Sequence, residues 1–175
     1  VSGDMDYPPY EFLEDGVPTG FNIDLIQAVA EVMDLSIQID LGPWNQVRHR
    51  LETAQVDILA GMYYSPERDR HVDFSVPHTL VTPGLFVRQD SPIHSLEDLR
   101  DRQVIVQQGD IMHDYLKKTG LTSHIIPVRD PSQAMRLLAS GRHDGVLLSS
   151  KMQGLYIAAQ YRLDNLENVA ADIPP

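Results

Sequence analysis

Apolar residues recur along this chain with two different spacings. From Asn22 to Met33 they return every three or four positions, which predicts an amphipathic helix with Asn22 as its N-cap. A second run with helical spacing begins at Trp44, whereas residues 37–41 alternate between apolar and polar, as a strand does. The elements predicted for this half are helix 22–33, strand 37–41, helix 44–54, a fully buried strand 56–60 and an extended segment 82–87.

The second half repeats a strand-then-helix order. Asp110 and Asp130 each precede a helical pattern as potential N-caps, and Gly120 is a potential stop signal. This order predicts an α/β protein with parallel strands, and the polar segment 89–92 marks a boundary. The predicted elements are strand 104–107, helix 111–119, strand 125–126, helix 131–140, strand 145–148, helix 151–161 and strand 166–169.

Arg68 is the candidate binding residue with the clearest local setting. A short helix predicted to open at Pro66 would place Arg68 in its first turn, directly after the predicted strand 56–60. Helix-start N–H groups and a guanidinium fork suit a carboxylate, and Gly61 would let the backbone approach a ligand closely. The alternative is a surface helix in which Arg68 pairs with Asp69 or Asp73.

Composition excludes several classes of partner. The formal net charge of −11 over 175 residues argues against nucleic acid and against an anionic membrane surface. There is no cysteine, so neither a disulfide nor a thiol nucleophile is available. No apolar run approaches the ~20 residues that cross a membrane, and no signal peptide is visible at Val1, so we expect any anchor or export signal outside this sequence.

Catalytic and metal-binding patterns are absent from the sequence. Its histidines lack the spacing of a zinc site, no nucleophilic triad is visible, and no phosphate-binding glycine motif occurs. His113 and Asp114 are expected to form a polar pair on a helix surface. We therefore predict no catalytic residue, no metal and no cofactor.

Several spaced motifs resemble bacterial periplasmic solute-binding proteins of the amino-acid type. The resemblance extends over essentially the whole chain. Within this family, the chain most resembles the sensor domains that are fused to histidine kinases or diguanylate cyclases. The motifs are DYPPYEF (6–12), GFNIDL (20–25), SPERDRHVDFSVP (65–77), VIVQQG (104–109) and LASGRHDG (138–145).

This resemblance implies a two-lobed, type II periplasmic-binding-protein-like fold. Residues 1–88 would form the first lobe and residues 89–175 the second. Chains of this family return from the second lobe to the first, and that C-terminal return is absent here, so the first lobe is expected to be incomplete. A deleted segment, a segment swapped from a partner and a truncated sequence remain alternatives, and a homodimer is a further expectation.

The resemblance also places candidate ligand-binding residues. Four of these residues also have a purely structural interpretation: Trp44 as part of the core, Tyr7 as packing for a rigid turn, Asp110 as an N-cap and Gly109 as a turn. The implied residues are Asp4, Tyr7, Trp44, Gly61, Tyr63 and Arg68 from the first lobe, and Gln108, Gly109, Asp110, Ile111 and Ser149 from the second.

Two places depart from the family pattern. Asp110 and Ile111 stand where relatives carry Thr or Ser, and Ser149 stands where they carry an ammonium-binding Asp. A carboxylate at Asp110 would repel an anion, which argues against a standard α-amino acid as the ligand. A different carboxylate, a cation recognised by Asp110, or no tightly bound ligand remain open.

The resulting functional hypothesis is a non-enzymatic extracytoplasmic sensor domain, tethered to the inner membrane through segments outside this chain. It would bind a small carboxylate or amino-acid-like solute between its lobes and signal to a histidine kinase. The alternatives are a free periplasmic solute-binding protein of an ABC importer and a periplasmic dehydratase acting on a cyclic carboxylic acid. The dehydratase would need an acid or base, for which Glu11 is the candidate.

Overall fold

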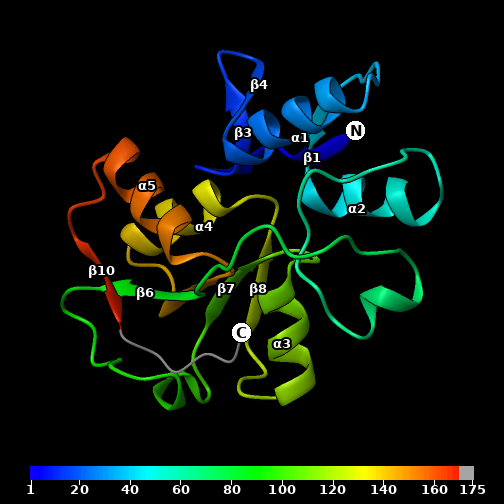
Figure 1. Cartoon of the computed structure of the whole chain (residues 1–175). Helices are drawn as coiled ribbons and strands as arrows, with labels where there is room; N and C mark the ends of the chain where they lie inside the picture. The colour runs from blue at the N-terminus through cyan, green and yellow to red at the C-terminus, as the bar shows by residue number, and fades with distance from the viewer. Residues whose placement is uncertain (170–175) are drawn as a thin grey trace. The chain divides into compact units, whose positions relative to one another are not determined.

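The computed structural model describes residues 1–169 (Figure 1). The chain divides into two compact units, Val1–Leu80 and Val81–Pro175, and each is described by itself. The predicted end of the second lobe, residues 170–175, lies outside the described residues.

The first unit contains two small sheets and two helices. A parallel pair is formed by β1 (Ser2–Asp4) and β5 (Asp40–Gly42). An antiparallel meander joins three further strands in chain order. Its strands are β2 (Asp6–Tyr7), β3 (Glu11–Glu14) and β4 (Val17–Thr19), and the helices are α1 (Phe21–Val32) and α2 (Trp44–Glu52).

Both predicted helices of this unit are present, but the start of the first differs from the prediction. The N-cap of α1 is Gly20, whose φ of 118° lies in a region that favours glycine. Asn22 is therefore not a cap. It lies inside the first turn, is buried, and donates a side-chain hydrogen bond to Glu11. The predicted strand 37–41 is shorter and shifted, because only residues from Asp40 onward pair with β1.

The prediction of a buried strand over 56–60 is wrong. Only Leu59 makes a bridge, to Ser2, and Ile58 is exposed. Because a single bridge is its only pairing in the described part of the chain, this apolar run does not become a ladder strand. The helix predicted to open at Pro66 is also reduced, to the single 3₁₀ turn η1 (Arg68–Arg70). The N–H of His71 already closes that turn on the carbonyl of Arg68.

The second unit is built on one mixed five-stranded sheet. The strand order is β10-β6-β9-β7-β8, and β7 runs parallel to both β8 and β9. The other two pairings, β6 with β9 and β10 with β6, are antiparallel. The strands are β6 (Gly84–Arg88), β7 (Val104–Gln107), β8 (Ile125–Val128), β9 (Gly145–Leu148) and β10 (Leu166–Val169).

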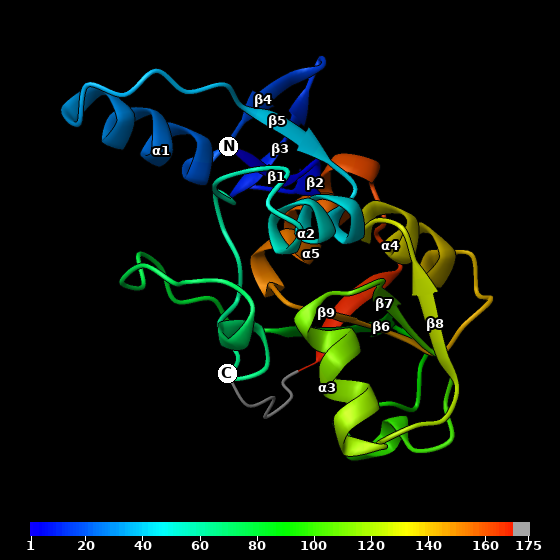
Figure 2. The same ribbon diagram turned by 90° about the vertical axis from the view of Figure 1, so that its right-hand side faces the viewer.

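Three helices cover the two faces of this sheet. α4 (Pro131–Ala139) and α5 (Lys151–Tyr161) lie on one face, and α3 (Ile111–Thr119) lies on the other, as Figures 1 and 2 show. Their positions match the sequence prediction closely, and the predicted bounds of α3, α5, β7, β9 and β10 are confirmed to the residue. The predicted capping residues are confirmed too, since Asp110 and Asp130 accept backbone N–H groups and Gly120 ends α3 with a φ of 63°.

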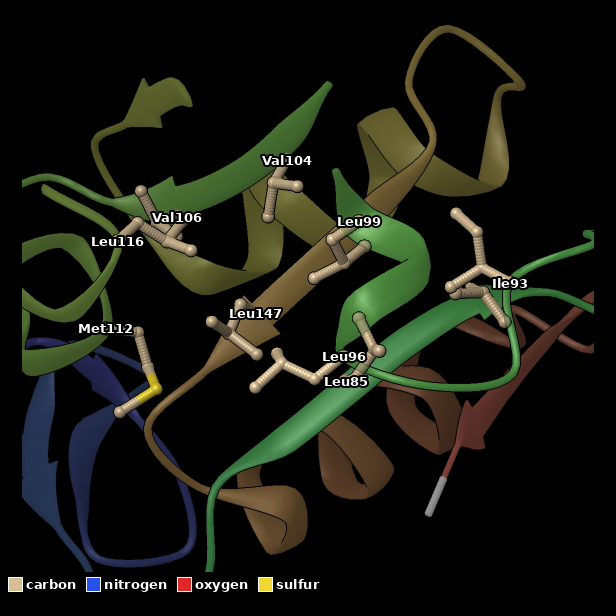
Figure 3. Packing of buried hydrophobic residues seen from close by; sticks show 10 residues of the cluster. Leu85, Ile93, Leu96, Leu99, Val104, Val106, Met112, Leu116 and Leu147 are labelled. Carbon is tan, nitrogen blue, oxygen red and sulfur yellow. The ribbon is translucent and has the colours of Figure 1, made fainter. Parts of the chain in front are cut away.

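Alternating strand residues divide the core of the second unit into two layers. Leu85, Val104 and Leu147 belong to the layer beneath α3, where Leu99 and Leu116 join them (Figure 3). The neighbouring strand residues point to the opposite face. That second layer comprises Phe86, Ile105, Val128, Ala134, Met135, Leu138, Val146, Leu148 and Ile157.

The division between the units differs from the predicted lobe boundary. The sequence placed it after residue 88, whereas the units meet between Leu80 and Val81. β6 accounts for the difference, because it pairs with β9 and β10 inside the sheet of the second unit. The polar segment 89–92 is thus a turn that follows β6. It includes a bond from the N–H of Ser91 to the carbonyl of Arg88.

Candidate functional site

Arg68 is the centre of a buried cluster in the first unit. Only 2% of the residue is exposed, and its backbone N–H donates to the Ser65 hydroxyl at 3.2 Å. One guanidinium nitrogen, Nη1, donates to the carbonyl of Tyr63 at 3.2 Å. The guanidinium carbon lies 5.8 Å from the ring centroid of Trp44, within the range of a cation–π interaction. The structure therefore fixes the orientation of the side chain from two directions.

The predicted tyrosines meet in the same unit. The hydroxyls of Tyr7 and Tyr63 lie 2.9 Å apart, at hydrogen-bonding distance. Tyr7 also stacks on Tyr10, with ring centroids 5.0 Å apart. Trp44 begins α2 and is 6% exposed, so it serves as core and as the aromatic partner of Arg68 at once. Four predicted residues are thus linked in the order Tyr7, Tyr63, Arg68, Trp44.

This cluster combines a fixed cation with aromatic rings. A guanidinium offers paired N–H donors to a carboxylate, and a neighbouring aromatic ring offers an apolar face to the rest of a small molecule. Such an arrangement is chemically suited to hold a small molecule with an acidic group.

Asp4 and Gly61 lie against a second polar group, centred on Glu11. The N–H of Asp4 donates to Glu11 Oε1 at 2.9 Å, and Nδ2 of Asn22 donates to Oε2 at 3.0 Å. A Cβ atom on Gly61 would lie 2.4 Å from Asn22 Nδ2, so only glycine allows this approach. Burial raises the pKa of Glu11 to about 7, although both hydrogen bonds act in the opposite direction.

In the second unit the predicted residues form the turn between β7 and α3. Their backbone N–H groups donate to acceptors of the same unit: Gln108 to the carbonyl of Val128, and Asp110 to the carbonyl of Gln107. The Asp110 carboxylate accepts the N–H of Met112 at 2.8 Å, as an N-cap does. A ligand bound through the Gln108 or Asp110 N–H groups would exchange these bonds for its own.

His113 contradicts its predicted place on a helix surface. It is 7% exposed, and its Nδ1 accepts the N–H of Gly109 at 3.0 Å. Because Nδ1 accepts, any ring proton resides on Nε2. Burial is the main reason that the pKa of His113 is lowered, with Lys117 contributing in the same direction. His113 is thus an uncharged support for the turn at Gly109, whose φ is 77°.

Ser149 and Ser150 follow β9 at the same edge of the sheet. Ser149 is 2% exposed, and the Ser150 hydroxyl caps α5 by accepting the N–H of Gln153 at 3.2 Å. The parallel strands β7, β8 and β9 all lead into helix starts at their carboxyl ends. Open α/β sheets bind ligands at such an edge. This edge of the sheet therefore holds the ligand-binding residues that were predicted in the second unit: Gln108, Gly109, Asp110, Ile111 and Ser149.

Sequence reasoning missed Asn22, His78 and His113 as parts of the candidate site. Asn22 Oδ1 lies 3.3 Å from His78 Nε2, and the ring of His78 stacks on Phe21. Asn22 carried a usable signal, but it was interpreted as a helix cap because it precedes an apolar-periodic run. The two histidines carried no spacing that pattern analysis could use.

Within residues 1–169, no three histidine or acidic side chains gather as a potential metal-binding group. None of the helices described above is both long and apolar enough to span a bilayer.

Comparison with solved structures supports the two-lobed fold. A histidine kinase sensor domain with similarity to periplasmic binding proteins superposes with a TM-score of 0.94 at 41% identity, covering 99% of this chain and 76% of that one. An ancestral arginine-binding protein bound to glutamine gives a TM-score of 0.89 at 26% identity, with 99% and 78% covered. The predicted α/β, two-lobed periplasmic-binding-protein-like fold is confirmed.

Curated relatives agree with this result. The arginine-binding extracellular protein ArtP of Bacillus subtilis is 34% identical over 110 residues, covering 62% of this chain and 43% of that protein. The amino-acid-binding protein AabA of Dichelobacter nodosus is 29% identical over 161 residues, with 89% and 63% covered. The chain thus spans roughly half the length of these two relatives. Residues 1–136 match the family described as bacterial extracellular solute-binding proteins, family 3, and the chain belongs to that family.

Proposed function

We propose that this chain binds a small carboxylate or amino-acid-like solute outside the cytoplasm, as the sensor domain of a membrane receptor. The observation that carries the binding proposal is the buried Arg68. Its guanidinium is held by the Tyr63 carbonyl and lies over the Trp44 ring. Burying a guanidinium is costly unless its donors are used, so a site that keeps one is suited to an acidic ligand.

The relatives support an amino-acid-like ligand class. ArtP is described as arginine-binding and AabA as amino-acid-binding, and ancestral arginine-binding proteins have been solved with glutamine and with arginine. The family is one of solute-binding proteins rather than enzymes, so we do not propose the dehydratase activity. L-Arginine and L-glutamine are therefore the first probes, with succinate as a carboxylate that has no ammonium group.

The receptor role is favoured by one comparison. The histidine kinase sensor domain is more similar in sequence, at 41% identity, than the ancestral arginine-binding proteins at 26% and 27%. In a receptor, a ligand that binds one arrangement of the two units better than another would shift their population and so change the output. A free solute-binding protein of an importer is the second candidate, because ArtP and AabA also match.

The binding proposal is tested by thermal shift and calorimetry on this chain. A ligand at ~100 times its dissociation constant adds about 2.7 kcal/mol of stability, which for this size raises Tm by roughly 5–10 °C. Arg68→Lys keeps the charge but loses the paired donors, so we expect it to weaken binding strongly. Arg70→Ala is the matched control, because Arg70 is exposed in the same 3₁₀ turn.

Two outcomes would overturn the proposal. One is no shift with any of the three probes or with a wider panel of amino acids and carboxylates. The other is a ligand whose affinity is unchanged in Arg68→Lys, since binding would then not depend on the guanidinium fork. The receptor role has its own test in the full-length protein, where ligand must change the activity of an attached signalling domain.

A further inference from the structure

Glu11 is a buried carboxylate that the binding proposal does not use. It is 1% exposed, and each of its two oxygens accepts a hydrogen bond from a different element of the first unit. Oε1 accepts from the backbone of Asp4 in β1, and Oε2 accepts from the side chain of Asn22 in α1. Both partners are donors, so the network as built suits the ionised carboxylate.

The Asn22 amide extends this network to His78. Because its NH₂ group faces Glu11, its carbonyl oxygen faces His78 Nε2, 3.3 Å away. A carbonyl oxygen can only accept, so Nε2 must carry a hydrogen while Glu11 is ionised. His78 lies two residues before Leu80, the last residue of the first unit. The network therefore runs from β1 to the segment that leads out of the unit.

The same groups support two predicted ligand contacts. Asp4 is anchored through its N–H to Glu11, and its own carboxylate accepts the N–H of Asp6 at 3.0 Å. Gly61 lies against the Asn22 amide, where a Cβ would be 2.4 Å from Nδ2. The position of both contacts thus depends on the orientation of Glu11 and Asn22.

We propose that Glu11 is a positioning residue for the predicted ligand contacts Asp4 and Gly61, and that rotation of the Asn22 amide transmits the charge state of Glu11 to His78. This inference rests on the proposed function, under which Asp4 and Gly61 contact the ligand. When Glu11 takes a proton from solvent on Oε2, that oxygen becomes a donor. Asn22 must then turn its carbonyl toward Glu11 and its NH₂ group toward His78.

The turned amide requires the opposite chemistry at His78. Its Nε2 must now accept, so His78 carries its hydrogen on Nδ1 instead. Each protonation of Glu11 is therefore matched by a change at His78 Nε2. The two arrangements use the same heavy atoms and differ in which groups donate.

Burial raises the pKa of Glu11 to about 7, which puts this exchange near neutral pH. The elements packed against β3 contribute few other charges. β1 brings Asp4, β2 brings Asp6 and Tyr7, and β4 has no ionisable residue. The acidic residues of α1, Asp24 and Glu31, are exposed, and none of these elements contains Lys or Arg.

The relay is tested by the ring ¹⁵N and ¹H signals of His78 in the whole chain, assigned with His78→Gln. In the wild type at pH 8.5, where Glu11 is ionised, we expect Nε2 to carry the ring hydrogen. Glu11→Gln supplies a permanent NH₂ donor, so His78 should show the Nδ1–H tautomer at pH 8.5. Glu14→Gln is the matched control, because Glu14 is exposed at the other end of β3 and should leave His78 unchanged.

Asn22→Ala separates a relay from a general perturbation. Without the amide, we expect the tautomer of His78 not to respond to Glu11→Gln. The inference is overturned if His78 keeps the Nε2–H form in Glu11→Gln, or if its response persists in Asn22→Ala. If a variant fails to fold, the wild type at pH 8.5 tests the relay by itself, and a His78 that carries its hydrogen on Nδ1 there overturns it.

Ligand affinity provides the second readout. At pH 8.5, Glu11→Gln should weaken binding of L-arginine or L-glutamine by roughly tenfold, the cost of one exchanged hydrogen bond to a charged group. Glu14→Gln should not. If the His78 signals behave as expected but the wild type binds none of the probes, the relay stands and the proposed function fails. If the probes bind and His78 does not respond, the relay is overturned alone.

Discussion

The interior of the second unit is mainly apolar, whereas that of the first is largely polar. The second unit buries two hydrophobic layers on the faces of one sheet. The first buries few apolar side chains, among them Ile23 and Val47, beside a polar group that is equally inaccessible. That group comprises Ser2, Asp4, Glu11, Asn22 and Arg68. Several apolar side chains of the first unit, such as Val32 and Ile58, are exposed instead.

This contrast separates two ways in which a sequence specifies the interior of a fold. Apolar layers gain stability without requiring particular partners, so the second unit is specified by pattern. A buried polar group is costly unless every donor meets an acceptor, so the first unit is specified by individual hydrogen bonds. Four predictions test this division, in order of decreasing effect.

The largest effect is expected from Leu116→Ala in the second unit. Leu116 is fully buried beneath the sheet, and removing such a side chain typically costs 2–5 kcal/mol, or ~3 kcal/mol here. Urea unfolding followed by far-ultraviolet circular dichroism measures the loss. Leu80→Ala, at a residue that is 96% exposed, should change stability by less than about 0.5 kcal/mol. Equal losses in the two variants would contradict the contrast between the units.

The second prediction concerns pH and Glu11. Its pKa is about 7 in the folded chain and near 4.5 when unfolded, so the folded state binds more protons between these values. This contribution to stability is complete below about pH 4.5 and is lost as pH rises to about 7, by ~3 kcal/mol. Trp44, the only tryptophan, reports unfolding of the first unit by fluorescence. Glu11→Gln should flatten the slope in this window, and an unchanged slope would show that Glu11 does not titrate there.

Gly61→Ala tests how tightly the polar group is packed. The new Cβ would lie 2.4 Å from the Asn22 amide, so we expect a loss of about 1–3 kcal/mol in urea unfolding followed by Trp44 fluorescence. Asn22→Ala removes the obstructing group, so the double variant should lose less than the sum of the two single losses. Strict additivity would indicate that the approach of Gly61 to Asn22 does not matter.

Ser150→Ala should have the smallest effect, because it removes one polar contact from the mainly apolar unit. The Ser150 hydroxyl caps α5 by accepting the N–H of Gln153, and loss of such a cap costs about 1 kcal/mol. Ser140→Ala, at an exposed hydroxyl after α4, is the control and should be close to neutral. Chemical denaturation resolves the difference. A larger loss than in Leu116→Ala would reverse the proposed order.

The same contrast explains how much the sequence could predict. In the second unit, apolar runs such as 104–107 and 145–148 became buried strands with the predicted bounds, and Asp110 became the predicted cap. In the first unit, the apolar run 56–60 became a partly exposed segment with a single bridge, because pairing and burial there do not follow apolar content. Hydrophobic patterning has no means of detecting a buried Glu11 or Asn22.

The candidate site was predictable where a residue's chemistry is local. Arg68 was identified from its motif, and the structure places its guanidinium against the Trp44 ring and the Tyr63 carbonyl. The roles of His78 and His113 depend on atoms that are distant in sequence or on burial. They become visible only when the chain is folded.

The cap at Asp110 has a consequence for how the specificity of this protein could evolve. A helix N-cap accepts Asp, Asn, Ser or Thr with little loss of stability. These four residues differ in charge, and Asp110 lies at the sheet edge where the turn after β7 begins α3. A single substitution could therefore reverse the preference of this edge between a cationic and a neutral group while the helix start survives. Under the proposed binding function, such a substitution changes the charge that a ligand meets at this edge without first requiring compensating mutations.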